Sequence, residues 1–229
     1  MCRYDRQADI VLRGFSGYNS RWALDMLRTS LLAPCNTDIY SMATIFFGAN
    51  DAVLSGDPQH CPLEEYQSNI SSMVQTLREH NPDIQLILIT PGTVDHTQWS
   101  TRHPDQVAQY ATALREVGVT LHVPVVDLWQ GDIAFDLHHP VPAVSSSTTP
   151  PAVPVPGNDD GNDFSDGLHL SRSGNRKVYT GVMNVITESY PNSLPDPEVL
   201  HFPSWKEMAG KPAAETRDIL RSWKWNSNC

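Results

Sequence analysis

The sequence has no long hydrophobic run and no cluster of basic residues. No stretch of it approaches the ~20 consecutive apolar residues that a transmembrane helix requires. Met1 is followed by charged residues instead of an apolar signal core. Lys and Arg number 16 against 26 Asp and Glu, so the formal net charge is −10. Nucleic acids and anionic membrane surfaces attract basic residues, and we therefore expect no nucleic-acid partner and no membrane span.

Cysteines are few and scattered. The four of them, Cys2, Cys35, Cys61 and Cys229, show neither CxxC spacing nor a His-rich neighbourhood, so no zinc ribbon or redox motif is predicted. With 229 residues, 40% of them hydrophobic, the chain is long enough to form one domain with its own core and needs no disulfide scaffold. We expect reduced thiols and a cytoplasmic protein.

Short apolar runs alternate with longer amphipathic segments. The runs predict strands at 10–12, 43–47, 85–90 and 121–126, and the second and third are apolar at nearly every position. The spacing of apolar residues predicts helices at 19–32, 62–79, 104–117 and 173–188. This alternation predicts an α/β fold with a parallel, doubly wound sheet, and we expect a single domain over residues 1–229.

Two segments break the alternation. Residues 139–162 are dominated by Pro, Ser, Thr, Gly and acids, which predicts an inserted disordered loop; a substrate lid is the alternative. The tail from about residue 191 has tryptophans spaced among charges, which predicts a short C-terminal helix packed on the body: Trp205, Trp223 and Trp225.

Turn-forming and hydrogen-bonding residues follow the first two predicted strands. In open parallel sheets, ligands bind outside the carboxyl ends of the strands. Asn50, in "GAND" after 43–47, can offer its amide N–H to an oxyanion. Gly17, in "GFSGYN" after 10–12, can offer a backbone N–H that no side chain blocks. Either motif alone is equally compatible with an ordinary strand-to-helix turn.

An Asp-x-x-His pair lies near the C-terminal end of the alternating region. In "DGLHL", Asp166 and His169 are three residues apart, so a helical turn or tight loop brings them together. The carboxylate can then hold the imidazole tautomer of a general base, although such a pair is also common as a surface cap. His96 and His103 stay open as alternatives to His169.

Taken together, the motifs resemble the SGNH, or GDSL-type, hydrolases, and most closely the isoamyl acetate-hydrolysing esterase subfamily. They stand, in order, at 13–22, 46–51, 62–66, 87–91, 126–129 and 165–175: "RGFSGYN-x-RW", "FFGAND", "PLEEY", "ILITP", "VDLW" and "SDGLHL-x-x-x-GN". The resemblance implies a flavodoxin-like three-layer α/β/α fold. It also implies an esterase of small acyl esters that needs no metal or other cofactor. Within the site, Gly17 and Asn50 would form the oxyanion hole, and Asp166 and His169 would be catalytic.

The family's first block, a strand ending in a G-D-S-like turn with the nucleophilic serine, is not recognisable. It should precede "GFSGYN" by one crossover of about 30 residues or more, yet few residues precede the strand predicted at 10–12. Ser16 is the nearest serine, but "GFSG" is not a G-x-S-x-G elbow. We therefore expect the nucleophile to be absent from these residues, through a truncated gene model or an inactive isoform. The sheet would then lack its first strand.

Three functions remain open at this point. The first is a serine esterase, impaired in this form because the nucleophile is missing. The second is a non-catalytic remnant that binds a small-molecule ester or serves a regulatory role. The third is an acyltransferase with the same triad. Substrate chain length and oligomeric state are not predicted.

Overall fold

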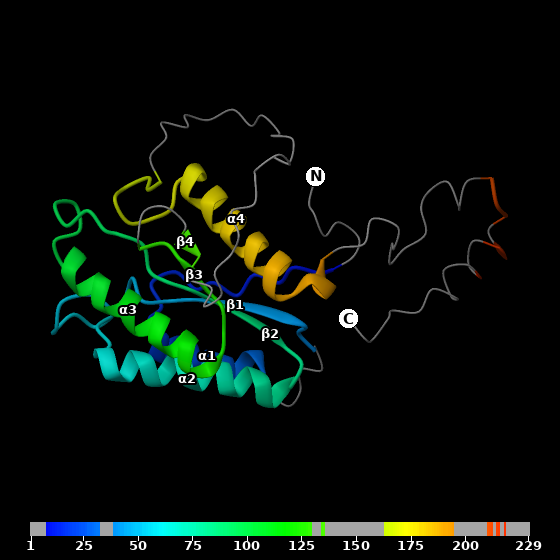
Figure 1. Ribbon diagram of the computed structural model, residues 1–229, viewed down its shortest axis with the longest axis horizontal. Coiled ribbons are helices and arrows are strands. Elements are labelled where there is room, and N and C mark those ends of the chain that lie inside the picture. Colours follow the sequence, from blue (N-terminus) through cyan, green and yellow to red (C-terminus); the bar gives the residue numbers. More distant parts are fainter. Residues whose placement is uncertain are drawn as a thin grey trace. The chain divides into compact units, whose positions relative to one another are not determined.

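A computed structural model describes residues 8–32, 39–129, 134–135, 163–194, 210–212, 214–215 and 218 (Figure 1). The chain divides into two compact units: residues 15–191 form one, and residues 1–14 with 192–229 form the other. The predicted insert at 139–162 and the three tail tryptophans lie outside the described residues. The single domain over residues 1–229 therefore stays a prediction.

A four-stranded sheet runs through the larger unit. Its strands are β1 (Met42–Phe46), β2 (Gln85–Ile89), β3 (Val125–Asp127) and β4 (Ala134–Phe135), and they lie in that order. β1 pairs in parallel with β2, and β2 with β3, whereas the short β4 is antiparallel to β3. The parallel pairing is confirmed for the first three strands. The antiparallel β4 was not predicted.

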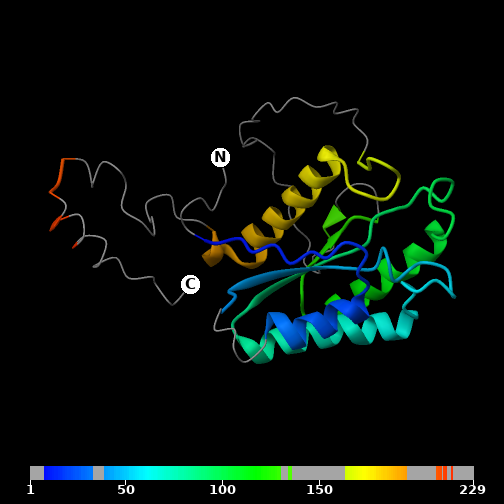
Figure 2. The same cartoon turned by 180° about the vertical axis from the view of Figure 1, so that it is seen from behind.

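Helices cover both faces of this sheet, as Figures 1 and 2 show. On one face lie α1 (Ser20–Met26), which continues as a π-helical turn (Leu27–Leu31), and α2 (Leu63–His80) and α3 (Pro104–Leu121). On the other face lies α4 (Arg172–Ser189), followed by a short 3₁₀ turn (Pro191–Ser193). Leu86 to Ile89 of β2 are buried because both faces are covered. The three-layer α/β/α fold predicted from the sequence is confirmed.

The strand predicted at 10–12 is wrong. No strand forms over residues 8–14, and Ile10 and Leu12 are 66% and 85% exposed. An apolar run becomes a strand only where a neighbouring strand supplies hydrogen bonds. Among the described residues no strand pairs with this segment.

The strand predicted at 121–126 begins later than expected, at Val125. α3 continues to Leu121 and ends at His122, whose left-handed φ of 52° closes the helix. Gly118 allows the end of α3 to approach β3, since a Cβ there would lie 2.4 Å from Val125 Cγ2. None of the helices in the described part of the chain is long and apolar enough to cross a membrane.

Candidate active site

The candidate residues come from three segments, one of which directly follows a strand. Gly17 precedes α1, Asn50 follows β1, and Asp166 and His169 lie in the turn that leads into α4. A fourth segment, the loop 90–103 between β2 and α3, contacts both the Asn50 turn and the Asp166 turn. This is the edge at which parallel sheets bind ligands.

Asp166 and His169 form the predicted pair. Asp166 Oδ2 lies 2.7 Å from His169 Nδ1, while Asp166 Oδ1 accepts hydrogen bonds from the backbone N–H of Leu168 and of His169. These bonds, with the backbone bond from His169 the largest contribution, lower the pKa of Asp166 to about 2. The ionised carboxylate is only an acceptor, so His169 Nδ1 carries the proton and Nε2 has a free lone pair. The pair therefore presents a general base in the required tautomer.

The Asp166–His169 turn is held by a contact with the neighbouring Asp95 loop and by a bridge between its own ends. Gly167 adopts a φ of +81°, and its carbonyl accepts a hydrogen bond from Asp95 N at 2.8 Å. A Cβ on Gly167 would lie 2.6 Å from Asp95 Cβ, so the two loops meet only because this residue is glycine. Phe164 and Leu170 form an antiparallel bridge that closes the turn.

The alternative bases, His96 and His103, lack such a partner. Their rings pack against each other with centroids 6.0 Å apart. The neighbouring Asp95 carboxylate accepts from Thr97 and Gln98 instead, and these bonds lower the pKa of Asp95 to about 2. Among the described residues, neither histidine has a hydrogen bond to a carboxylate that would orient its ring. The geometry therefore favours His169.

Asn50 is half-buried and its amide is oriented. Asn50 Nδ2 donates to Tyr18 O at 2.9 Å, and Asn50 Oδ1 accepts from Arg102 Nη2 at 2.9 Å. An amide nitrogen carries two hydrogens, and the Tyr18 carbonyl uses one of them. No described residue accepts the other hydrogen, so it can be donated to a ligand oxygen.

Gly17 lies in a turn next to Tyr18 and has a φ of +79°. Its carbonyl accepts from Gln59 Nε2 at 2.7 Å. Among the residues that the structure describes, none accepts a hydrogen bond from Gly17 N–H. The two predicted oxyanion donors therefore come from adjacent segments, joined by the bond from Asn50 to Tyr18.

The site has two halves, the Gly17 and Asn50 segments on the one hand and the Asp166–His169 turn on the other. They are connected by three residues that the sequence did not indicate. The Trp99 ring lies edge-on to the His169 imidazole, with centroids 5.6 Å apart. Arg102 Cζ lies 5.2 Å from the centroid of the Trp99 ring, and the same guanidinium reaches Gln59 Oε1 at 3.2 Å. No direct hydrogen bond joins the Asp166–His169 pair to Gly17 or Asn50 within the described ranges. No spacing or motif signalled Trp99, Arg102 or Gln59, because the residues that each of them bonds across the site are far away in sequence.

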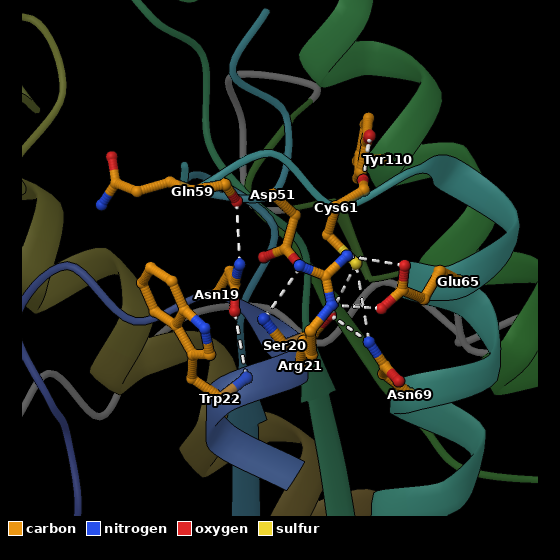
Figure 3. Close-up of polar contacts among 10 residues, drawn as sticks. All are labelled: Asn19, Ser20, Arg21, Trp22, Asp51, Gln59, Cys61, Glu65, Asn69 and Tyr110. Atoms are coloured by element: carbon orange, nitrogen blue, oxygen red, sulfur yellow. Dashed lines mark hydrogen bonds and ion pairs between the residues drawn. The ribbon is translucent and has the colours of Figure 1, made fainter. Parts of the chain in front are cut away.

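A buried polar network fixes the start of α1 beneath these turns, as Figure 3 shows. The Asn19 side chain accepts from Trp22 N and donates to Gln59 O, which ties the helix N-terminus to the 48–61 loop. Beside this contact, Ser20 Oγ and Asn69 Nδ2 reach the buried Cys61 thiol. Cys61 is a free thiol, and burial raises its pKa to about 11.

Asp51 is the member of this network that keeps a buried oxygen without a partner among the described residues. Its Oδ1 accepts from Ser20 N at 2.8 Å, but its Oδ2 is buried and accepts no hydrogen bond from the described residues. Burial raises the pKa of Asp51 above its usual 3.8. An acid with a raised pKa binds its proton more tightly in the folded state, so its ionisation lowers stability as the pH rises above about 3.8.

We expect Asp51→Asn to flatten this pH dependence. The amide keeps an oxygen for Ser20 N and removes the charge, so the variant loses less stability than the wild type between pH 4 and pH 7. Urea unfolding at several pH values measures the difference, with the exposed Asp25→Asn as control. Parallel curves for the wild type and Asp51→Asn would contradict the assignment.

The described residues do not include a nucleophile next to the base. In this part of the chain, no hydroxyl hydrogen-bonds to His169 Nε2. Ser165 Oγ bonds the carbonyl of His169 instead, and the exposed Ser16 has no bond to the imidazole. Nor does any group of three or more His, Cys, Asp or Glu side chains gather there that could hold a metal ion.

Comparison with known proteins gives consistent results. The GDSL-like lipase/acylhydrolase family matches residues 2–177. A human isoamyl acetate-hydrolyzing esterase 1 homolog is 34% identical over 220 residues, which are 90% of this chain and 78% of that protein. The isoamyl acetate-hydrolyzing esterase of Saccharomyces cerevisiae is 31% identical over 90% of this chain and 80% of its own length.

Solved structures agree on the fold. The crystal structure of a lipase/acylhydrolase from Enterococcus faecalis superposes with a TM-score of 0.52 at 22% identity, over 76% of this chain and 72% of that one. This chain belongs to the GDSL-like lipase/acylhydrolase family, which confirms, at the level of the family, the ester-hydrolase function predicted from the sequence.

Proposed function

We propose that this chain carries the acid–base pair and the oxyanion donors of a serine esterase that cleaves small carboxylic esters. The observation that carries this proposal is the Asp166–His169 pair, whose 2.7 Å bond leaves His169 Nε2 free to accept a proton. Gly17 N–H and the second N–H of Asn50 are the donors for the tetrahedral oxyanion. The reaction requires no metal or other cofactor.

The chemistry follows from these positions. A serine hydroxyl attacks the ester carbonyl while His169 Nε2 takes its proton, and the oxyanion forms at the donors from Gly17 and Asn50. The imidazolium, stabilised by Asp166, then protonates the departing alcohol. Water attacks the acyl-enzyme with His169 again as base, which releases the acid and restores the serine.

Apolar surface beside the oxyanion donors supports a small apolar ester as substrate. Three aromatic rings lie close to Gly17 in the sequence. The Tyr18 ring centroid lies 5.0 Å from that of Phe15 and 5.9 Å from that of Trp22. They are half-buried or exposed, and partly exposed aromatic rings offer contact area to an alkyl or acyl group. The relatives named for isoamyl acetate fit such a substrate. We also propose a cytoplasmic location, which fits the free thiol of Cys61.

The serine is assigned to a segment other than those described. We expect the chain of 229 residues to hydrolyse p-nitrophenyl acetate barely above the uncatalysed rate, because none of the described residues offers His169 a hydroxyl to activate. Joining a segment that contains a strand and a G-D-S-like turn to the N-terminus should give turnover. We call this the extended form. Turnover by the 229-residue chain that disappears in His169→Ala would overturn this assignment of the serine.

The absence of such a hydroxyl among the described residues also favours a second candidate, a binding protein that keeps the ester site without catalysis. Such a protein would bind a short ester or its acid and gain thermal stability from it. A melting assay with isoamyl acetate and with acetate, run beside the hydrolysis assay, separates the two. If isoamyl acetate or acetate stabilises the extended form too, and that form does not hydrolyse the ester, the result would favour the binding protein.

A further inference from the structure

The loop between β2 and α3 contacts both halves of the site. Backbone contacts hold both ends of the loop. At one end, Val53 and Arg102 form an antiparallel bridge and Leu54 N donates to Thr101 O. At the other, Asp95 N donates to Gly167 O. One end of the loop is thus fixed to the Asn50 segment and the other to the Asp166 segment. Trp99 lies between these contacts, and Arg102 is part of those at the Asn50 segment.

Arg102 is buried without a carboxylate partner. The residue is 5% exposed, and none of the ion pairs among the described residues includes it. Its guanidinium donates only to neutral oxygens, including Ala49 O at 3.1 Å, Asn50 Oδ1 and Gln59 Oε1. Burial lowers the pKa of Arg102, and only the attraction of Asp57, which forms no salt bridge with it, opposes this. A buried cation without a salt-bridged counter-ion lowers stability unless something else compensates for it. An anion that forms nearby during the reaction would meet this positive charge.

The guanidinium also decides which end of the Asn50 amide faces which neighbour. Arg102 has donors and no acceptor, so the atom of Asn50 that faces it must be oxygen. The amide nitrogen then faces Tyr18 O and the proposed oxyanion position. Donation to Oδ1 also polarises the amide and strengthens its N–H groups as donors.

Trp99 links Arg102 to the Asp166–His169 pair. Its indole Nε1 donates to Asp166 O at 2.8 Å, and its ring contacts both the His169 imidazole and the Arg102 guanidinium. Through one side chain, the loop therefore contacts the orienting acid, the base and the cation.

We propose that Arg102 and Trp99 are positioning residues, which orient the Asn50 amide and fix the Asp166–His169 turn relative to it. This inference rests on the proposed function for the role of these groups in ester cleavage. The connection itself is a statement about structure that can be tested without turnover.

Hydrogen exchange in the 229-residue chain tests the connection. In Trp99→Phe, which removes the indole N–H and keeps an aromatic ring, we expect the backbone N–H groups of Leu168 and His169 to exchange about tenfold faster. In Arg102→Met, we expect the Trp99 indole N–H and the Asn50 side-chain amide to shift in NMR spectra. Arg102→Lys should not restore them, since one ammonium cannot reproduce the fork of donors.

A matched control separates this effect from general destabilisation. Arg78 also donates from Nη2 to a main-chain carbonyl, that of Leu121 at 3.0 Å, but at the far end of α2. Arg78→Met removes a similar guanidinium-to-carbonyl hydrogen bond and should leave the Trp99, Asn50 and His169 signals unchanged. Equal signals in Arg102→Met and the wild type would overturn the proposal. If Arg102→Met does not fold, Trp99→Phe decides alone: unchanged exchange at Leu168 and His169 then overturns it.

A double-mutant cycle in the extended form tests the catalytic consequence. Removal of an oxyanion donor costs roughly 10²- to 10³-fold in kcat, and we expect Asn50→Ala to fall in this range. Arg102→Met should lower kcat about tenfold or more with KM nearly unchanged, but have almost no further effect in the Asn50→Ala background. Additive losses would overturn the positioning role. If the extended form has no turnover but the exchange and NMR changes occur, the connection stands and the proposed function fails.

Discussion

We expect replacement of Asp166 by Asn to lower the kcat of the extended form by roughly 10³- to 10⁴-fold, with little change in KM. The backbone N–H groups of Leu168 and His169 both point at Oδ1, so this position must remain oxygen in the amide. The NH₂ group therefore replaces Oδ2, facing His169 Nδ1. Because a donor now meets Nδ1, the imidazole must carry its proton on Nε2 and can no longer accept the proton of a serine.

Kinetics with a chromogenic short-chain ester measure this loss, and Asp163→Asn is the control. Asp163 lies on the same segment and pairs with Lys177 and Ser173, away from the imidazole. We expect it to keep near-normal kcat.

Because the pKa of Asp166 is about 2, its ionisation should add no limb to the pH–rate profile between pH 4 and pH 9. An Asp166→Asn variant with more than a tenth of the wild-type kcat would refute the role of orienting acid.

Gly174→Ala should lower both stability and turnover. Gly174 lies in the first turn of α4, and a Cβ there would be 2.1 Å from Asp163 O and 2.9 Å from Leu170 Cδ2. The carbonyl belongs to the backbone and cannot rotate away, since it also accepts from Ser171 N. Relief of the clash must move the 163–171 turn away from α4, and with it the Asp166–His169 pair.

Overpacking of this kind costs about 1–3 kcal/mol, although helix propensity alone favours Ala over Gly by about 1 kcal/mol. Denaturant midpoints measure the stability change, and kcat in the extended form measures the displacement of the pair. Gly14→Ala is the control, because nothing lies within 4 Å of its Cβ position. A Gly174→Ala variant as stable and active as the wild type would show that the turn does not depend on this contact.

Local patterns predicted much of the fold. β2 reads as a strand because each of its residues after Gln85 is apolar and buried. α2 reads as a helix because acids occupy its first turn and apolar residues recur on one face. The segment 10–12 has the same local pattern as a strand and does not form one. Pairing depends on a neighbour elsewhere in the chain, and a local window holds no information about it.

Some residues of the candidate site could likewise be predicted from local sequence, and others could not. Asp166 and His169 are three residues apart, so their meeting is a property of one turn and can be read from the sequence. Asn50 follows a strand, and its position at the sheet edge could also be predicted. Trp99 and Arg102 could not, because their partners lie 67 and 52 residues away.

The sequence by itself determined the alternation of strands and helices, the Asp166–His169 pair and the family. Each of these depends on contacts within a few residues or on the order of short motifs. Only the tertiary structure decided that segment 10–12 has no strand partner, which end of the Asn50 amide faces outward, and that a buried Arg102 lies between the two halves of the site. These facts depend on groups brought together by packing of distant segments, where geometry and desolvation, not local spacing, decide which atoms meet.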